Sequence, residues 1–187
     1  YVASYDIVNA LFGYGSFTEA SVKNTSAALK FFAIGIPAFA LLKIFSSFYF
    51  ARNNTQTPFH LSVVVVVINL ALSIYLFRII GFIAIPIATT ISTWIIVFAY
   101  IFKFVEKDIH KFDNIFFGKI IKMFLSSALM AIFLIYMISF LADKLIYDSS
   151  LKILYLFLIV GLSIVVYFLI SVLIGSIKFG RKKSIII

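Results

Sequence analysis

Three polar side chains lie within strongly apolar sequence, and their oxygen atoms are the first candidates for chemistry. Asn69 and Ser73 are four residues apart, so they share one face of a helix. Thr89 belongs to a group of hydroxyl side chains at positions 89–93 in the next apolar stretch. Polar groups are costly in lipid. They therefore indicate either hydrogen bonds that hold helices together, or a small-cation site or cavity wall.

Two cations form the second candidate group. Lys43 lies 16 residues into an apolar stretch that begins at Ala27, about two-thirds of the way across a bilayer at 1.5 Å per residue. Its amine either extends to the cytoplasmic face of the membrane or faces a polar cavity. Arg52 is the one charge in the polar segment 52–57. This arginine is placed to meet a lipid phosphate at the membrane edge.

The residues do not indicate an enzyme. The chain has no cysteine, and its seven acids are scattered along it. His60 and His110 lie at the edges of apolar stretches, and His60 has no carboxylate at helical spacing. Metal-ligand spacing, a nucleophile elbow and a phosphate-binding glycine loop are all missing from the sequence. We therefore expect no catalytic residues.

The composition requires lipid as the solvent for much of the chain. Of 187 residues, 64% are hydrophobic and 12% are charged, about half the charged share of a soluble domain. The mean hydropathy is +1.16. The net charge of +9 comes from cations that flank the apolar stretches, as in membrane proteins. The bilayer is therefore the expected partner, and nucleic acid is not.

Five apolar stretches are long enough to cross a hydrocarbon core of about 30 Å as helices. The predicted spans are 27–50, 59–77, 82–102, 120–141 and 151–177. They are too long and too continuous for the strands of a membrane barrel. The predicted fold is an all-α, polytopic membrane bundle over residues 25–187. Residues 1–24 are predicted to form the end of a preceding membrane helix, or an interfacial helix, followed by an external loop, because residues 1–12 are mildly amphipathic.

Local signals predict where the helices begin and break. Gly81 is expected to end the second span and to form a short turn before the third. Pro37 and Pro86 fall inside the predicted first and third spans, where a proline removes a backbone hydrogen bond and favours a kink. The expected helix caps are Ser16 or Thr18 after the first loop, Thr25 or Ser26 for the first span, Thr57 with Pro58 for the second, and Ser149 or Ser150 for the fifth.

The distribution of lysine and arginine predicts the orientation. With five spans, one face holds the Arg52 loop, the loop from Lys103 to Lys122 and the C-terminus, which together carry ten cations. The opposite face carries five. Positive charges are enriched on cytoplasmic loops. The Arg52 loop, the 103–119 loop and the C-terminus are therefore predicted to be cytoplasmic.

The last two predicted spans contain long stretches without charge, at 123–141 and 153–174. They alternate small and bulky side chains, which indicates either a plain lipid-facing surface or a groove for a long lipid tail. The candidate groove residues are Ser127, Phe133, Tyr136, Gly161, Ser163, Tyr167 and Ser171.

One part of the sequence resembles a known family. The segment LFGYGSFT is followed by a span ending in FYFARNNTQTP, and this pattern resembles the MurJ or MviN family of lipid II flippases. The chain departs from the family pattern in its aromatic pair, Tyr49-Phe50, and in Asn54, which replaces an acid. The matching positions are Leu11, Phe12, Gly15, Phe17, Thr18, Gly35, Lys43, Tyr49, Phe50, Ala51, Arg52, Thr55, Thr57 and Pro58.

The resemblance implies an architecture and a function. Members of the family have fourteen spans in two lobes around a central cavity, in the bacterial inner membrane. This chain would supply the last five spans, and the preceding spans of the same transporter would be its partner. The family moves an undecaprenyl-linked peptidoglycan precursor between leaflets by alternating access. Lys43 and Arg52 would then contact the substrate or the opposite lobe, while the cavity arginines of the family lie in spans outside this chain.

The resemblance also implies two sites. Some members of the family bind Na⁺, and the matching positions here are Asn69, Ser73, the carbonyl of Ile85, and Thr89. Ser73 stands where such members have an aspartate, so we expect no measurable Na⁺ binding to this chain alone, and no other cofactor. The final pair of spans in the family forms a groove for the isoprenoid tail, which corresponds to the charge-free stretches above.

Two alternative functions remain open from the sequence. One is export of a polysaccharide-linked lipid or a drug by another member of the same exporter superfamily. The other is a membrane anchor or assembly subunit with no transport role.

Overall fold

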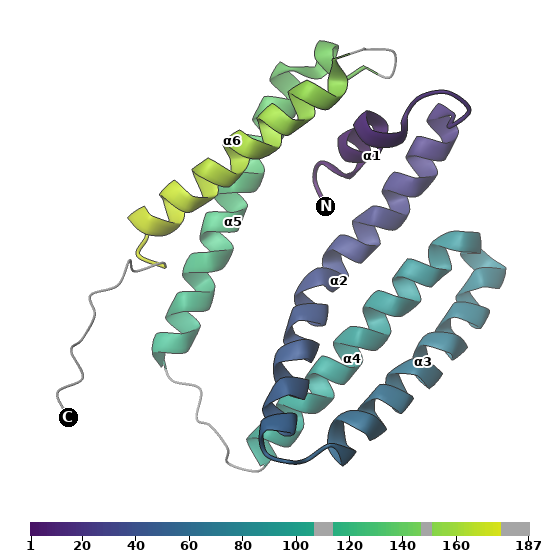
Figure 1. The fold of residues 1–187 in the computed structure, drawn as a ribbon, viewed down its shortest axis with the longest axis vertical. Coiled ribbons are helices and arrows are strands. Elements are labelled where there is room, and N and C mark those ends of the chain that lie inside the picture. Colours follow the sequence, from purple (N-terminus) through teal and green to yellow (C-terminus); the bar gives the residue numbers. More distant parts are fainter. Residues whose placement is uncertain (107–113, 147–150, 177–187) are drawn as a thin grey trace. The chain divides into compact units, whose positions relative to one another are not determined.

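A computed structural model describes residues 1–106, 114–146 and 151–176. Helices account for the regular structure of this described part, which contains no strand. The helices are α1 (Ser4–Phe12), α2 (Glu19–Ala51), α3 (Gln56–Ile80), α4 (Ala84–Glu106), α5 (Asn114–Phe140) and α6 (Lys152–Leu173), with 3₁₀ turns η1 (Gly81–Ile83) and η2 (Ala142–Lys144) (Figure 1). The predicted all-α bundle is therefore confirmed.

The helices are long and apolar enough to cross a membrane. Four apolar stretches meet that requirement in the described residues: Glu19–Ala51, Gln56–Lys103, Gly118–Phe140 and Lys152–Leu173. The second stretch holds two antiparallel helices, α3 of 25 residues and α4 of 23 residues (Figure 1). Each of these is long enough to span alone, since about 20 residues suffice. Gly81, with a φ of +65°, makes the turn between them, as its lack of a Cβ allows.

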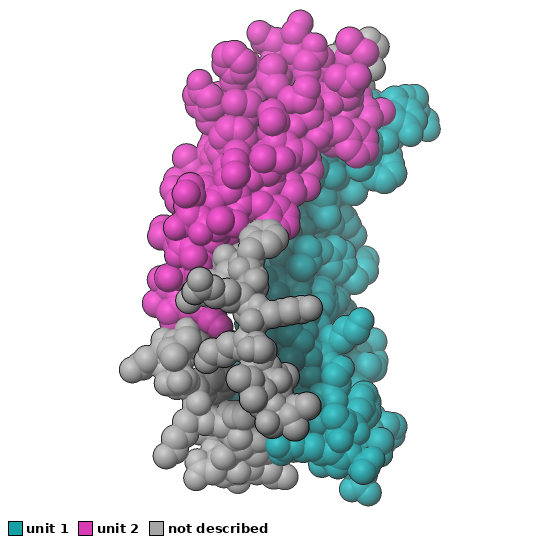
Figure 2. All heavy atoms as spheres, turned by 60° about the vertical axis from the view of Figure 1, so that its left-hand side comes forward, with its two compact units in different colours: residues 1, 3–111 teal, residues 2, 112–187 magenta. Residues whose placement is uncertain are grey.

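The chain divides into two compact units, residues 1 and 3–111 and residues 2 and 112–187 (Figure 2). In the first unit, α1 packs on α2, and α4 packs on both α2 and α3. Helix α4 lies between its neighbours because one of its faces is buried along its length. The residues of this face recur at every fourth position: Ala84, Ala88, Ser92, Ile96 and Tyr100. The second unit contains the packed pair α5 and α6.

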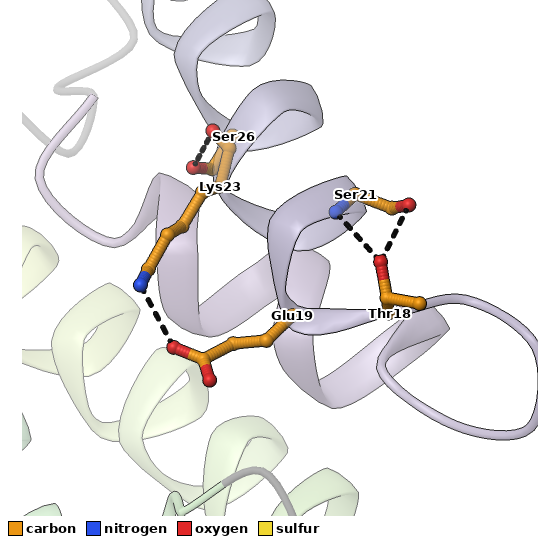
Figure 3. A network of polar contacts seen from close by, with 5 residues as sticks. All are labelled: Thr18, Glu19, Ser21, Lys23 and Ser26. Atoms are coloured by element: carbon orange, nitrogen blue, oxygen red, sulfur yellow. Dashed lines mark hydrogen bonds and ion pairs between the residues drawn. The ribbon is translucent and has the colours of Figure 1, made fainter.

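The start of α2 confirms one predicted cap, Thr18, and excludes two others. The helix begins at Glu19, and its cap is Thr18, whose Oγ1 accepts a hydrogen bond from the Ser21 amide at 3.3 Å. Glu19 and Lys23 form an ion pair of 2.9 Å one turn along (Figure 3). The alternative caps Thr25 and Ser26 were wrong, because both lie within the helix; the Ser26 hydroxyl donates to the Lys23 carbonyl instead.

Two other local predictions are corrected. Pro86 lies in the first turn of α4 rather than in its interior. An amide at that position would have no helical partner, so the proline costs no hydrogen bond there. The predicted pair of Thr57 as cap and Pro58 as first helical residue is also wrong, because α3 begins at Gln56. Ser149 and Ser150 lie outside the described residues, and Leu151 precedes α6.

Candidate functional site

The polar residues singled out on α3 and α4 meet in one hydrogen-bond network. The Asn69 side-chain amide donates to the Thr89 hydroxyl at 3.0 Å and to the Ser92 hydroxyl at 3.4 Å. The Ser73 hydroxyl donates to Asn69 Oδ1 at 3.3 Å. The Thr89 hydroxyl donates in turn to the Ile85 carbonyl at 2.8 Å. The structure therefore brings together all four residues of the candidate cation site.

The network fits hydrogen bonding between helices better than Na⁺ coordination. Asn69 presents its NH₂ group, not its oxygen, to Thr89, and the Thr89 proton occupies the Ile85 carbonyl. The four residues include no carboxylate to offset the dehydration of an ion. In the part of the chain that the structure describes, no group of three or more His, Cys, Asp or Glu side chains could hold a metal. The network joins α3 to α4.

Two shallow hollows adjoin the network on the α3–α4 hairpin, of about 340 and 330 Å³. The first shares Asn69, Thr89 and Ser92 with the network, and the second shares Ser73 and Ile85. The remaining lining residues are Val65, Val66, Leu70 and Thr93 in the first and Ile74, Phe77 and Arg78 in the second. Sequence reasoning missed Ser92 as a partner of Asn69, although Ser92 follows Thr89 at a helical spacing of three.

A second set of polar contacts joins α4 to α2 next to Pro37. The Thr90 hydroxyl donates to the Phe31 carbonyl at 2.9 Å, and Trp94 Nε1 donates to the Ile34 carbonyl at 3.2 Å. Proline has no amide and disturbs the helical hydrogen bonds of the preceding turn. The carbonyl that loses its helical partner at Pro37 is that of Ala33, whereas Thr90 and Trp94 donate to the carbonyls of Phe31 and Ile34 on either side of it in the sequence. Sequence reasoning missed these contacts, since the only signal was two donors four residues apart.

Gly35 makes the close approach of α2 to α4 possible. A Cβ atom built on Gly35 would lie 2.9 Å from Thr90 Oγ1 and 3.0 Å from the Phe39 ring. Small residues allow such close helix contacts in membranes. Farther along, a cluster of Tyr49, Leu61, Ile96 and Tyr100 fills the space between α2, α3 and α4.

The Arg52 segment is a tightly hydrogen-bonded connection between α2 and α3. Asn53 adopts a left-handed φ of 57°, and its amide bonds to the Phe50 carbonyl while the Asn54 amide bonds to the Tyr49 carbonyl, each at 3.0 Å. This pair of bonds is the Schellman arrangement that ends a helix. The Asn54 side chain then accepts the Thr57 amide at 3.1 Å at the start of α3. Both helix ends are therefore capped by residues of the connection itself.

The two candidate cations lie apart. The Arg52 guanidinium stacks over the Phe48 ring, with Cζ 4.1 Å from the ring centroid, a cation–π contact. Lys43 is exposed on α2. Nine residues separate the two, so they lie about 13 Å apart along the axis and on opposite sides of the helix.

The candidate groove residues on α5 and α6 fall on different surfaces. Ser163 and Ser171 are buried, and the Ser163 hydroxyl donates to the Ile159 carbonyl of its own helix. Ser127, Tyr136 and Gly161 are exposed, and Phe133 and Tyr167 are half-buried. On α6, Ser163, Tyr167 and Ser171 follow one another at intervals of four and share a face, whereas Gly161 lies opposite. The structure thus separates the candidate residues into an exposed, a half-buried and a buried group.

These features define a multi-pass helical membrane protein whose hairpin helices carry interhelical polar networks. Comparison with known families is more specific. Residues 1–174 match the family model described as "Lipid II flippase MurJ". The chain belongs to this family, as the resemblance over residues 11–58 predicted.

Individual relatives agree with the family match. A probable lipid II flippase MurJ of Borreliella burgdorferi is 29% identical over 178 residues, which are 94% of this chain and 34% of the relative. The corresponding protein of Buchnera aphidicola (subspecies Schizaphis graminum) is 28% identical over 167 residues, 89% of this chain and 32% of the relative. That of Rickettsia prowazekii is 32% identical over 93 residues, 50% of this chain and 18% of the relative. The chain therefore spans about a third or less of the length of these relatives.

Proposed function

We propose that this chain is the C-terminal part of a flippase that moves lipid II, an undecaprenyl-linked peptidoglycan precursor, between the leaflets of the bacterial inner membrane. The family match over residues 1–174 carries the proposal. The other spans of the same transporter are the proposed partner, and rocking of two lobes alternates access. The chain is proposed to act as a transporter and not as an enzyme.

A complementation experiment tests this proposal. The full-length gene that contains this chain is expressed in a bacterium whose own lipid II flippase can be depleted. Restored growth and restored lipid II translocation are the expected result. Growth without translocation would indicate a supporting subunit, and export of another lipid-linked polysaccharide or a drug would assign the chain to a different exporter of the superfamily. Either outcome contradicts the proposal.

The Arg52 connection is proposed to be cytoplasmic, as are the 103–119 loop and the C-terminus. The excess of lysine and arginine on this face supports the orientation. Gln56 is the better position for a labelling cysteine than Asn53, because Asn53 has a left-handed backbone and Gln56 is exposed at the start of α3. Gln56→Cys in the full-length protein is expected to react with an impermeant thiol reagent only from the cytoplasmic side. Reaction from outside would reverse the orientation.

The exposed side of α5 and α6 is proposed to contact the lipid tail. Ser127, Tyr136 and Gly161 are exposed and uncharged, whereas the buried Ser163 and Ser171 position the helices. A Cβ built on Gly161 would meet no atom within 4 Å, so a larger residue fits without disturbing the chain. Gly161→Leu in the full-length protein is expected to leave abundance normal and abolish flipping. If this variant flips lipid II as well as the parent, these helices are only a wall facing lipid.

A further inference from the structure

Helix α2 contains one interruption in its backbone hydrogen bonding, at Pro37. The helix passes through this proline as one element, Glu19–Ala51. Because proline has no amide, the Ala33 carbonyl has no donor from the next turn of the helix. Prolines inside helices are common sites of kinks, and α2 changes direction along its length (Figure 1). Pro37 therefore divides α2 into a first segment, residues 19–36, and a second segment, residues 38–51.

The second segment is fixed to α4 by aromatic packing. Phe45 stacks on Tyr100 with ring centroids 5.6 Å apart, and the Tyr49 ring lies 5.5 Å from the Tyr100 ring. Tyr49 and Tyr100 are both buried, and the Ser46 and Tyr100 hydroxyls are 3.4 Å apart. Packed aromatic pairs of this kind stabilise a contact beyond the area that they bury. The second segment and α4 are therefore firmly packed together.

The first segment is attached to α4 by weaker contacts. Its hydrogen bonds to α4 are those from Thr90 to the Phe31 carbonyl and from Trp94 to the Ile34 carbonyl. At the closest approach to Thr90, Gly35 contributes no side chain to the contact. Loss of one polar contact between membrane helices typically changes an equilibrium about threefold. The two sides of Pro37 therefore differ in how strongly they are held.

Release of the first segment leaves its backbone bonding intact. A backbone carbonyl accepts two hydrogen bonds, so Phe31 and Ile34 keep their bonds within α2 when the two donors leave. The Thr90 hydroxyl can then donate to a carbonyl of its own helix. Helix α1 packs on α2 and lies beside the first turns of that helix (Figure 1), so α1 moves with the first segment.

We propose that Pro37 is a hinge at which the first segment of α2, together with α1, pivots relative to α4 during transport. The hydrogen bonds from Thr90 and Trp94 hold the closed position. The inference rests on the proposed function, because alternating access requires parts of a transporter to move against one another. Asn24 lies 13 residues, or about 20 Å, before Pro37. A change of about 20° in the kink therefore displaces Asn24 by about 7 Å.

Distances between spin labels, measured by pulsed electron paramagnetic resonance, test the hinge in the full-length protein in nanodiscs, with no other cysteine present. Asn24→Cys with Phe102→Cys measures the first segment against α4, and Ile44→Cys with Tyr75→Cys measures the second segment against α3. All four positions are exposed. The first pair is expected to give two distances about 7 Å apart, and the second pair is expected to give one.

Removal of the two donors tests what holds the closed position. Thr90→Val and Trp94→Phe are each expected to raise the ratio of released to closed molecules about threefold, as read from the first pair of labels. The second pair should be unchanged, which verifies that each variant is folded. A single distance for the first pair in the parent that neither variant alters would overturn the hinge and leave the flippase function intact.

The two prolines of the helices provide a variant and its matched control. Pro37→Ala restores an amide for the Ala33 carbonyl, so the first pair is expected to give one distance and flipping is expected to slow about tenfold or more. Pro86→Ala, in the first turn of α4 where no helical bond is lost, should keep both distances and flip within about threefold of the parent. Two distances and unchanged flipping in Pro37→Ala would overturn the proposal. If the parent gives two distances but does not flip lipid II, the hinge stands and the proposed function fails.

Discussion

The two units of this chain use polar side chains in different ways. In the first unit, Asn69, Thr90 and Trp94 donate hydrogen bonds across helix boundaries. In the second unit, Ser126 and Ser163 donate to carbonyls of their own helices. A bond between helices depends on the relative position of both partners, whereas a bond to the preceding turn forms on an isolated helix. We infer that polar contacts specify how α2, α3 and α4 pack, while α5 and α6 rely on apolar and small-residue contacts.

Substitution of one glycine in each unit gives the largest expected contrast. Gly35→Leu should destabilise the protein by about 3 kcal/mol, because overpacking and loss of the Thr90 hydrogen bond act together. Gly161→Leu, on open helix surface, should leave stability within about 0.5 kcal/mol of the parent. Thermal unfolding in detergent measures both. Equal destabilisation by the two substitutions would contradict the difference between the units.

The interhelical donors near Pro37 are expected to have the next largest effect. Thr90→Val and Trp94→Phe should each cost about 1 kcal/mol, the usual net value of a hydrogen bond. Ser163→Ala removes a hydroxyl that bonds only within α6, so it should cost less than about 0.5 kcal/mol. Thermal unfolding of the three variants ranks them. A larger loss from Ser163→Ala than from Thr90→Val would reverse the inferred roles of the hydroxyls.

The ends of α2 and α6 allow a comparison at similar backbone geometry. Asn53 and Gly175 both have left-handed backbones, with φ of 57° and 69°, and each is followed by the same pair of capping hydrogen bonds. Alanine at either position should cost about 1 kcal/mol, because its Cβ disfavours this conformation. Asn53→Gly should be neutral or slightly stabilising. A stability of Asn53→Ala equal to that of the parent would show that the connection relaxes to another conformation.

The α3–α4 network should give the smallest effect. Asn69→Ala should cost about 0.6 kcal/mol, the average found for polar contacts between membrane helices. Replacement of K⁺ by Na⁺ should leave the melting temperature of this chain unchanged, because the Asn69 amide already donates to the Thr89 hydroxyl and that hydroxyl donates to the Ile85 carbonyl. Sodium-dependent stabilisation that disappears in Asn69→Ala would show that the network rearranges to hold the ion.

Much of the architecture followed from the sequence by itself. Apolar stretches of about 20 residues predict membrane helices. In lipid, the backbone N–H and C=O groups of such a stretch have no water to bond, so they form hydrogen bonds within the helix. The spacing of Asn69 and Ser73 predicts a shared face, because a helix repeats every 3.6 residues. Gly81 predicts the turn of the hairpin, because the turn has a positive φ that is unfavourable for residues with a Cβ atom. Each of these features depends only on residues that lie close together in the sequence.

The tertiary structure alone decided which residues act together. Helix α2, which packs on α1, begins at Glu19 and not at the start of the apolar stretch at Ala27. Trp94 and Thr90 contact carbonyls on α2 that are about 60 positions away in sequence, and only the packing of the helices sets which donors reach them. Gly161 and Ser163 are two residues apart yet differ in burial, because the neighbouring surfaces determine which face is covered. Contacts between distant segments depend on the relative placement of whole helices, which no local pattern encodes.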